Sequence, residues 1–597
     1  MATELSVLRA AILIFLIFPS SLLFLSTAAS KIWPVGRAER LSSQTLTPLE
    51  SLLTGLQSAA LRSFGQEGFD PKLYVDLPLK TPLAEAKAAF EALPQLSNGT
   101  IPSATLKDYI DKFYDAAGSD LLPYTPGDYK VEPDSFLPRV QSGDARAWAL
   151  KIHALWLQLS RKVANDVLNN SDLHTLLPLT HPVIVPGSRF REVYYWDSYW
   201  IIRGLVVSKM FDTAKGIVQN LLSLVEAYGF VPNGARTYYT NRSQPPLLSE
   251  MVRVVYKSTS DLKFLKEAFH LLVREHRFWD SALHRVRIKD KKGQIHLLSR
   301  YSANWMEPRP ESFTTDELIA QNLSEADRQS LYHEIASTAE TGWDFSSRWM
   351  ENTSTLSSLR TSLIVPVDLN AFLFQMATNI AYFARELGKE KSAKHFGDAA
   401  KARRLAVDSI LWTSQAGQWL DFWIPSKNHT DESLRGVHSF KDGTHNYGAF
   451  PSNFIPLWSG LLRRGDSRLR RIVQAFNSSG LLYPAGMATS LTNTTQQWDF
   501  PNAWPPLQHM MIEGLSRSTS RSAKSIARVM SKKWIQTTYA SFNETGEMLE
   551  KMDAQECGKI GNGGEYTTQA GFGWSNGVIL ALLDRYGWEE DIPLNCI

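Results

Sequence analysis

The feature that most constrains the fold is an alternation, from about residue 145 onward, between apolar helical segments and loops rich in glycine, proline and aromatic residues. In the first helical segment, 145–163, Trp148, Ile152, Trp156 and Leu159 recur on one face, which is the periodicity of an amphipathic helix. The same pattern predicts further helices over 199–210, 213–228, 246–255, 260–279, 368–387, 389–411, 452–462, 467–476, 504–515, 521–542 and 574–586.

These segments come in pairs separated by turn-rich loops, and no strict sequence repeat relates the pairs. We therefore expect an all-α fold in which helical hairpins close on themselves, an α/α toroid, rather than an open solenoid. One end of such a fold carries the long loops, and function is expected at that end. Between about residues 42 and 141 repeated prolines interrupt the pattern, so short helices that wrap the larger body are expected there.

The loops carry unusual clusters of acidic, basic and aromatic residues. The stretch 340–349 holds Glu340, Asp344 and Arg348 together with two tryptophans and a phenylalanine. A flat aromatic ring covers the apolar face of a sugar, and carboxylates and arginines hydrogen-bond its hydroxyl groups. A carboxyl group held against tryptophan is also partly desolvated, which raises its pKa and suits it to act as a general acid. The alternative interpretation is an aromatic core segment whose charges face solvent.

Similar clusters occur at 186–200, 232–246, 309–311, 497–506 and 550–574. Trp-Asp pairs occur four times, and three of them lie in these glycine- or proline-marked loops. The fourth, Trp279-Asp280, closes an amphipathic helix, so we interpret it as a core tryptophan beside a solvent-facing acid. The segments between the pairs are helical and irregularly spaced, which excludes a β-propeller.

Composition favours a neutral ligand. The formal net charge of the 597-residue chain is +3, and no run of five or six like charges appears, which argues against a nucleic-acid partner. The two cysteines, Cys557 and Cys596, have no zinc-site spacing, so no metal site is expected. They could pair in an oxidising compartment or remain two thiols.

The N-terminus indicates entry into the secretory pathway. Arg9 precedes an apolar run over 10–25, and small residues follow it up to Ala29, the pattern of a signal peptide in residues 1–29. The run is also close to the ~20 residues that span a bilayer, so an uncleaved membrane anchor is the alternative. Either one predicts an extracellular or plasma-membrane location, with the main domain outside. Candidate N-glycosylation acceptors are Asn98, Asn169, Asn241, Asn322, Asn352, Asn428, Asn477, Asn493 and Asn543. Asn241 sits among candidate ligand-binding residues, and no glycan is expected there.

The stretches 186–200 and 497–506 resemble the two signature motifs of the trehalases, glycoside hydrolase family 37. The stretch 340–349 and the glycine-rich segment that ends in Trp574-Ser575-Asn576-Gly577 are similar to the same family, and the resemblance covers the chain from about residue 50 onward. Ser188, Thr341 and Met552 depart from the usual family pattern, but none of them replaces a catalytic carboxylate.

The resemblance implies one catalytic domain over residues 30–597, an (α/α)6 toroid of six helical hairpins with an N-terminal wrapping segment to about residue 145. It implies hydrolysis of α,α-trehalose to two glucose molecules with inversion, without a metal or organic cofactor. By family position Asp344 is the general acid and Glu550 the general base, about 6.5–9.5 Å apart to admit a water molecule. The sugar contacts it implies are Arg189, Trp196, Asp197, Asn233, Arg242, Ser243, Gln244, Arg309, Glu311, Gly342 and Glu565.

Two alternatives remain open at this point. One is a helical-toroid hydrolase that acts on another α-glucoside, and the other is a sugar-binding or sensing protein without catalysis. The presence of both Asp344 and Glu550 argues against the sensor, because binding alone does not need an acid and a base on opposite faces of a bond.

Overall fold

A computed structural model of the chain describes residues 45–187, 189–425, 436–441 and 443–596. The expected signal peptide or anchor, residues 1–29, and the acceptor Asn428 lie outside the described residues. Within them, no helix is both long and apolar enough to cross a membrane.

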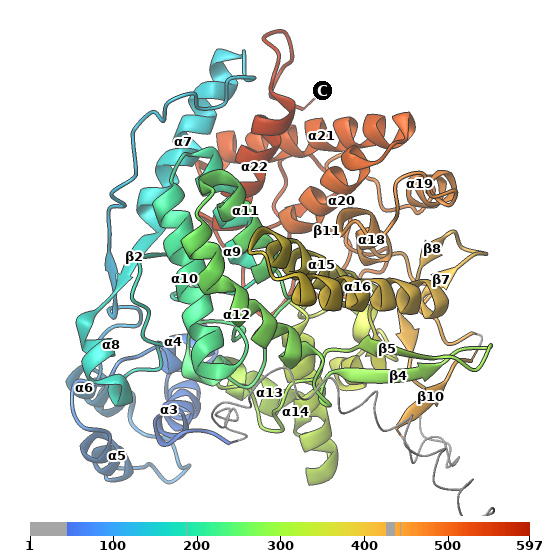
Figure 1. The fold of residues 1–597 in the computed structure, drawn as a ribbon. Coiled ribbons are helices and arrows are strands. Elements are labelled where there is room, and N and C mark those ends of the chain that lie inside the picture. Colours follow the sequence, from blue (N-terminus) through green and yellow to red (C-terminus); the bar gives the residue numbers. More distant parts are fainter. Residues whose placement is uncertain (1–44, 188, 426–435, 442, 597) are drawn as a thin grey trace, which may run out of the picture. The chain divides into compact units, whose positions relative to one another are not determined.

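Inner helices form a closed ring in the described part of the chain (Figure 1). They are α9 (Asp197–Val207), α11 (Leu248–Thr259), α15 (Val367–Glu386), α18 (Ile455–Trp458), α20 (Pro505–Arg517) and α22 (Gly573–Tyr586). Each one packs against the next, and α22 packs back against α9, which closes the ring.

An outer helix precedes each inner helix in the chain. The outer helices are α7 (Gly143–Leu159), α10 (Phe211–Tyr228), α12 (Leu262–Trp279), α16 (Glu390–Ile410), α19 (Leu469–Asn477) and α21 (Arg521–Thr545). Because every hairpin runs outer helix first and inner helix second, the inner helices share one direction along the barrel. The predicted (α/α)6 toroid is confirmed.

Several predicted bounds differ from the structure. The segment 145–163 was expected to be helical throughout, but its last residues form β2 (Ser160–Val163), which pairs with β1 (Leu121–Pro123) and β3 (Val183–Ile184). The segment 452–462 was expected to be one helix, but only a 3-10 turn, Pro451–Phe454, and the single turn of α18 form. Gly460, at φ 76°, adopts the left-handed conformation that ends such a helix.

Other elements were not among those predicted from the sequence. These are α13 (Phe313–Ala320), α14 (Glu325–Glu340) and the hairpin of β4 (Arg285–Lys289) with β5 (Ile295–Ser299). The C-terminal half of α14 is buried mainly through small and polar residues such as Ala336, Ser337 and Thr338, so it lacks an apolar stripe. The remaining strands are β6 (Ile364–Val365), β7 (Trp412–Thr413), β8 (Gln418–Trp419), β9 (Phe422–Trp423), β10 (Val437–Ser439), β11 (Asn502–Ala503) and β12 (Met552–Asp553). Strands β7 and β8 pair with each other.

The N-terminal segment begins with a helix of 17 residues, which is longer than its prolines predict, and continues with the expected short helices. In order, the helices are α3 (Pro48–Phe64), α4 (Pro71–Val75), α5 (Leu83–Glu91) and α6 (Ser103–Phe113), with α8 (Asn165–Asn169) following α7. Gln57 joins α3 to a loop of the barrel, because its side chain donates to the Pro310 carbonyl (3.0 Å) and accepts from the Thr314 N–H (2.9 Å). This segment therefore packs against the loop that contains residues 309–314.

Cys557 and Cys596 form a disulfide, which decides between the two alternatives that the sequence leaves open for them. The bond ties the loop after β12 to the C-terminal residues. The described glycosylation acceptors other than Asn241 are exposed, whereas Asn241 is buried and its side chain donates to the Tyr238 carbonyl (3.1 Å).

Arg348 is the centre of a fully buried ion-pair network. Its guanidinium donates to both oxygens of Asp368 (2.7 and 2.8 Å) and of Asp421 (2.7 and 3.0 Å). Asp368 lies in the first turn of α15, and Asp421 also accepts from the Val367 N–H (2.8 Å). The network therefore fixes the segment after Asp344 to the start of an inner helix.

The Arg348→Met substitution is expected to destabilise the fold by about 3–5 kcal/mol, because it leaves two buried carboxylates without their counter-charge. Urea unfolding followed by tryptophan fluorescence measures this. Arg285→Met is the matched control, since the Arg285–Asp280 pair is 4.0 Å apart and both side chains are about 40% exposed (40% and 41%). The control should lose less than about 1 kcal/mol. Equal losses in the two variants would contradict the role given to the buried network.

Candidate active site

A cavity lies at the end of the barrel where the inner helices begin. Trp196 and Asp197 at the start of α9, Trp504 just before α20, and Trp574 in the first turn of α22 all line it. Its other walls come from the loops that the sequence marks as rich in acids and aromatic residues. The expectation that function sits at one end of the toroid therefore has a definite location in the structure.

Most of the residues expected at the site line this one cavity. They are Arg189, Trp196, Asp197, Asn233, Arg242, Arg309, Glu311, Gly342, Asp344, Glu550 and Glu565. Ser243 and Gln244 lie behind its wall instead. Ser243 donates its hydroxyl to the Val231 carbonyl (2.7 Å), and the Gln244 side chain accepts from the Trp196 N–H (3.1 Å). The two residues support the loop and the tryptophan that face the cavity.

Asp344 faces the cavity with a carboxyl group that is partly accessible and otherwise surrounded by protein. Burial is the main cause that raises the pKa of Asp344 to about 7; Glu565 contributes in the same direction, while Arg309 and Arg242 oppose the increase. Gly342, at φ 70°, precedes it, and a Cβ atom there would lie 3.0 Å from the Trp196 ring. Only glycine allows the chain to pass that close to Trp196 in this conformation.

Glu550 is 1% exposed and is held in place by two donors. The Tyr566 hydroxyl donates to Oε1 (2.7 Å) and the Gln569 N–H donates to Oε2 (3.3 Å). Burial raises the pKa of Glu550, while Lys551, the Tyr566 hydrogen bond and Arg189 oppose that increase. The carboxylate form of Glu550 thus has partners that Asp344 lacks.

A third carboxyl group, Asp197, is electrostatically coupled to the other two. Burial raises the pKa of Asp197 to about 8, and the charges of Glu550 and Asp344 raise it as well. Carboxyl groups that share a site do not all ionise together near neutral pH, because like charges disfavour one another at low dielectric. The cavity can therefore hold a proton-donating and a proton-accepting carboxyl at the same time.

Arginines pair with further carboxylates around the cavity. Arg309, which is 2% exposed, bridges Asp316 (2.7 Å) and Glu565 (2.9 Å). Arg242 pairs with Glu311. Such planar, always-charged groups orient carboxylates and bind hydroxyl oxygens through fixed N–H directions.

Arg189 is paired from outside the barrel. Its Nη2 lies 2.8 Å from Asp70, which also caps α4 in the N-terminal segment by accepting from the Lys72 N–H. The Arg189 guanidinium lies over the Tyr566 ring, 4.7 Å from its centroid. The N-terminal segment thus positions a cation beside the hydroxyl group that holds Glu550.

Stacked tryptophans form one wall. Trp498 lies parallel to Trp504 with centroids 4.0 Å apart, and it stacks on Trp343 at 5.4 Å. Trp196 contacts Trp498 at a tilt of 41°, and Trp574 is nearly perpendicular to Trp504, at 87°. Trp196, Trp498, Trp504 and Trp574 also line the cavity, so aromatic surface is available for the apolar side of a sugar ring.

Some residues of the site were not predicted from the sequence. Tyr566 lies within the glycine-rich segment, so its position next to a predicted motif was the available signal. Asp70 and Asp316 carry no signal, because neither lies in one of the clusters of acidic, basic and aromatic residues that mark the predicted loops. Glu340, by contrast, is fully buried away from the cavity, where it accepts from the N–H groups of Ser243 (3.0 Å) and Ser302 (2.8 Å). It joins two loops rather than facing a ligand.

A metal site was not expected, and the described residues contain no group of three or more His, Cys, Asp or Glu side chains arranged to hold a metal ion.

An (α/α)6 barrel whose loop end gathers carboxyl groups, arginines and tryptophans around one cavity has the architecture and the chemistry of a glycoside hydrolase. Comparison with known proteins identifies the group. The trehalase family model matches residues 66–587, and the chain belongs to the trehalase family.

Similar proteins come from plants and animals. A probable trehalase of Oryza sativa subsp. japonica is 52% identical over 92% of this chain and 97% of its own length. The trehalase of Arabidopsis thaliana is 45% identical, with 92% and 87% of the two chains covered, and that of Homo sapiens is 40% identical, with 87% and 86% covered. Among solved structures, neutral trehalase Nth1 from Saccharomyces cerevisiae matches with a TM-score of 0.53 at 24% identity, covering 68% of this chain and 74% of that chain. The similarity to the yeast structure shows a shared fold.

The Asp70→Asn substitution tests whether the N-terminal segment supports the cavity. Asparagine keeps a side-chain oxygen to cap α4 but loses the charge that pairs with Arg189. We expect the KM for trehalose to rise roughly tenfold, the size of a lost charge-assisted hydrogen bond of about 1.5 kcal/mol. Steady-state kinetics measure it, with far-UV circular dichroism to verify the fold. Asp115→Asn, an exposed acid of the same segment, should leave KM unchanged. An unchanged KM in Asp70→Asn would show that Arg189 needs no support from this segment.

Proposed function

We propose that the chain hydrolyses α,α-trehalose to two glucose molecules with inversion, with Asp344 as the general acid and Glu550 as the general base. The observation that carries this assignment is the difference between the surroundings of the two carboxyl groups. Asp344, with a pKa near 7, stays largely protonated in mildly acidic solution. Glu550 has a tyrosine hydroxyl, a backbone N–H and two nearby cations that favour its ionised form.

In the proposed reaction, Glu550 takes a proton from a water molecule while the water oxygen bonds to one anomeric carbon. On the opposite face Asp344 gives its proton to the bridging oxygen, and the bond between that oxygen and the anomeric carbon breaks. Glu550 ends protonated and Asp344 ends ionised, so one proton must pass through solvent before the next turnover. This geometry predicts the two carboxyl groups about 6.5–9.5 Å apart, as inverting glycosidases require.

The other cavity residues would bind the two glucose units. The tryptophan wall suits the apolar face of one ring, and the arginines Arg189, Arg242 and Arg309 suit the hydroxyl groups. Asp197, Glu311 and Glu565 would accept hydrogen bonds from sugar hydroxyl groups. Gly342 would leave space beside Trp196, and Asn233 would supply a further amide. Ser243 and Gln244 would act indirectly, through the loop and the tryptophan that they hold.

We also propose that the chain enters the secretory pathway, as the N-terminal sequence predicts. The Cys557–Cys596 disulfide and the exposed glycosylation acceptors suit an oxidising compartment.

Substitutions of the two carboxyl groups separate their roles. Glu550→Gln is expected to abolish glucose release from trehalose, and Asp344→Asn to reduce it by roughly 10²–10⁴-fold. α-Glucosyl fluoride needs no protonation of its leaving group, so Asp344→Asn should retain much more activity on it than on trehalose. Glu550→Gln should lose activity on both substrates, because the water still needs a base.

Asp280→Asn is the matched control, since it alters the Trp-Asp pair that lies outside the cavity, and it should keep full activity. Proton NMR of the first turnovers should show one of the two glucose molecules released as the β-anomer. Equal loss of fluoride and trehalose hydrolysis in Asp344→Asn would remove its assignment as the acid.

The pH profile of kcat/KM should be bell-shaped with an acidic to near-neutral optimum. Activity falls as pH rises through about 7, because Asp344 loses the proton that it must donate. Activity falls at low pH as Glu550, whose pKa lies above 4.5, becomes protonated. Tyr566→Phe removes a hydrogen bond to the ionised form of Glu550, so the acidic limb should move to higher pH and the basic limb should stay. Activity that still rises above about pH 8 would contradict the assignment.

A further inference from the structure

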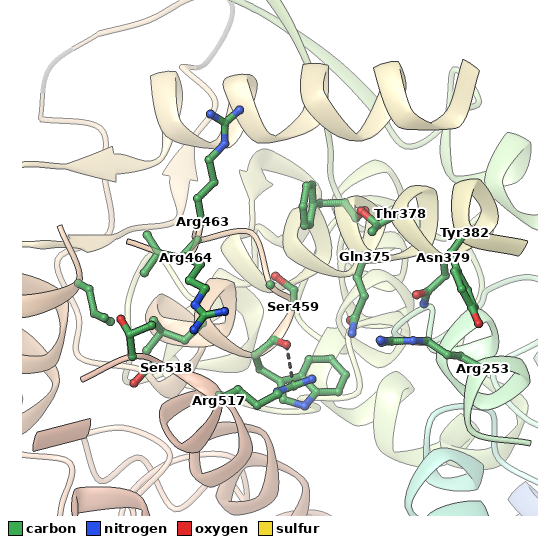
Figure 2. Close-up of a pocket in the computed structure, with 18 of the residues that line it drawn as sticks. Arg253, Gln375, Thr378, Asn379, Tyr382, Ser459, Arg463, Arg464, Arg517 and Ser518 are labelled. Atoms are coloured by element: carbon green, nitrogen blue, oxygen red, sulfur yellow. Dashed lines mark hydrogen bonds between the residues drawn. The ribbon is translucent and has the colours of Figure 1, made fainter. Parts of the chain in front are cut away.

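A second cavity, of about 690 Å3, lies at the other end of the barrel from the carboxyl groups (Figure 2). Its walls come from the later turns of α11, α15 and α20, from the loop after α18, and from the start of α21. Because the inner helices share one direction and begin at the active-site end, their later turns lie at the opposite end. This cavity is therefore separate from the proposed active site.

The ionisable groups that line it, tyrosine aside, are all basic. They are Arg253, Lys257, Arg463, Arg464, Arg517 and Lys524, and no aspartate or glutamate is among the lining residues. Two acids lie just behind the wall and already have partners. Glu250 pairs with Arg253 (3.2 Å) and accepts from Asn379 (2.8 Å). Glu513 pairs with Arg203 (3.2 Å) and Arg517 (3.3 Å).

Only part of the positive charge of the cavity is balanced within the described part of the chain. There, Lys257, Arg463, Arg464 and Lys524 make no ion pair. The pKa of Lys257 is lowered chiefly by the neighbouring Arg253 cation, with burial and Arg517 adding to the effect and Glu250 opposing it. Crowded like charges are unfavourable unless an anion joins them.

Neutral polar groups complete one side of the cavity. Gln375 is only 4% exposed, and its side-chain oxygen has no hydrogen-bond partner among the described residues. Figure 2 shows Arg253 and Arg464 extending from opposite sides toward the middle, where Gln375, Ser459 and Arg517 lie. Arg463 points away from this centre. The cavity therefore combines guanidinium groups with a side-chain amide.

We propose that this cavity binds a small phosphate-bearing ligand of the size of a sugar phosphate. Guanidinium groups match phosphate oxygens in a forked geometry, and several cations around one concavity lower the cost of its negative charge. The buried amide oxygen of Gln375, which has no hydrogen-bond partner among the described residues, suits a hydroxyl group of the organic part. A cavity of this size and shape fits a small molecule better than a polymer.

The test is isothermal titration calorimetry of the purified full-length chain with inorganic phosphate, glucose 6-phosphate and glucose. Saturating glucose is present in the phosphate and sugar-phosphate titrations to occupy the active site. We expect one saturable site for each phosphate compound and tighter binding of glucose 6-phosphate than of inorganic phosphate.

The double variant Lys257→Gln with Arg464→Gln should bind inorganic phosphate and glucose 6-phosphate at least tenfold more weakly. Both side chains are exposed and unpaired in the described structure, so the fold should be kept. The matched control is Lys263→Gln with Lys266→Gln on the exposed face of α12, which removes the same charge away from the cavity.

Unchanged affinities in the control together with the loss in the cavity variant would support the proposal. No saturable binding of either phosphate compound would overturn it. Equal losses in the two double variants would also overturn it, since only the net charge would then matter. Glucose 6-phosphate binding no tighter than inorganic phosphate would refute the assignment of the amide side of the cavity to the organic part.

Discussion

The active-site end of the barrel depends on arginines that pair with carboxylates away from water. Arg309 joins the start of α13 to the glycine-rich segment through Asp316 and Glu565, and Arg348 joins the segment after Asp344 to α15. Removal of one partner would leave a buried charge without compensation, which costs far more than an exposed pair contributes. The loops around the cavity are therefore fixed relative to one another by charge as well as by packing.

This fixed charge arrangement decides the protonation of the carboxyl groups in the cavity. Burial alone would raise the pKa of each of them, because a low dielectric disfavours the ionised form. The groups differ in what opposes burial. Glu550 has Lys551, Tyr566 and Arg189 beside it, whereas Asp344 feels the attraction of Arg309 partly cancelled by the repulsion of Glu565. One cavity can thus hold two carboxyl groups of different protonation, because their neighbours come from separate loops.

The Trp-Asp pairs show what could be predicted from the sequence and what could not. Loop position and neighbouring glycine or proline correctly placed Trp196, Trp343 and Trp498 at or beside the cavity, and the helical pattern correctly placed Trp279 in the core. Helical periodicity likewise predicted the barrel, since apolar stripes report burial directly. It could not reveal α14, whose buried face consists of small and polar residues. Nor could it reveal the roles of Asp70, whose partner Arg189 lies far away in the sequence, or of Asp316, whose pairing with Arg309 follows no local pattern. Interactions that depend on the assembled barrel leave no mark in a single segment.

The direction of the inner helices fits the distribution of acidic and basic residues between the two ends of the barrel. The start of an α-helix carries partial positive charge and its end partial negative charge, so acids are favoured near the first turn and bases near the last, by about 0.3–1 kcal/mol each. Asp197 and Asp368 lie in the first turns of α9 and α15, whereas Lys257 and Arg517 lie in the last turns of α11 and α20. Since all inner helices run the same way, these small preferences add at each end of the ring. The toroid therefore favours a carboxyl-rich cavity at the end where its inner helices begin and a basic cavity where they finish.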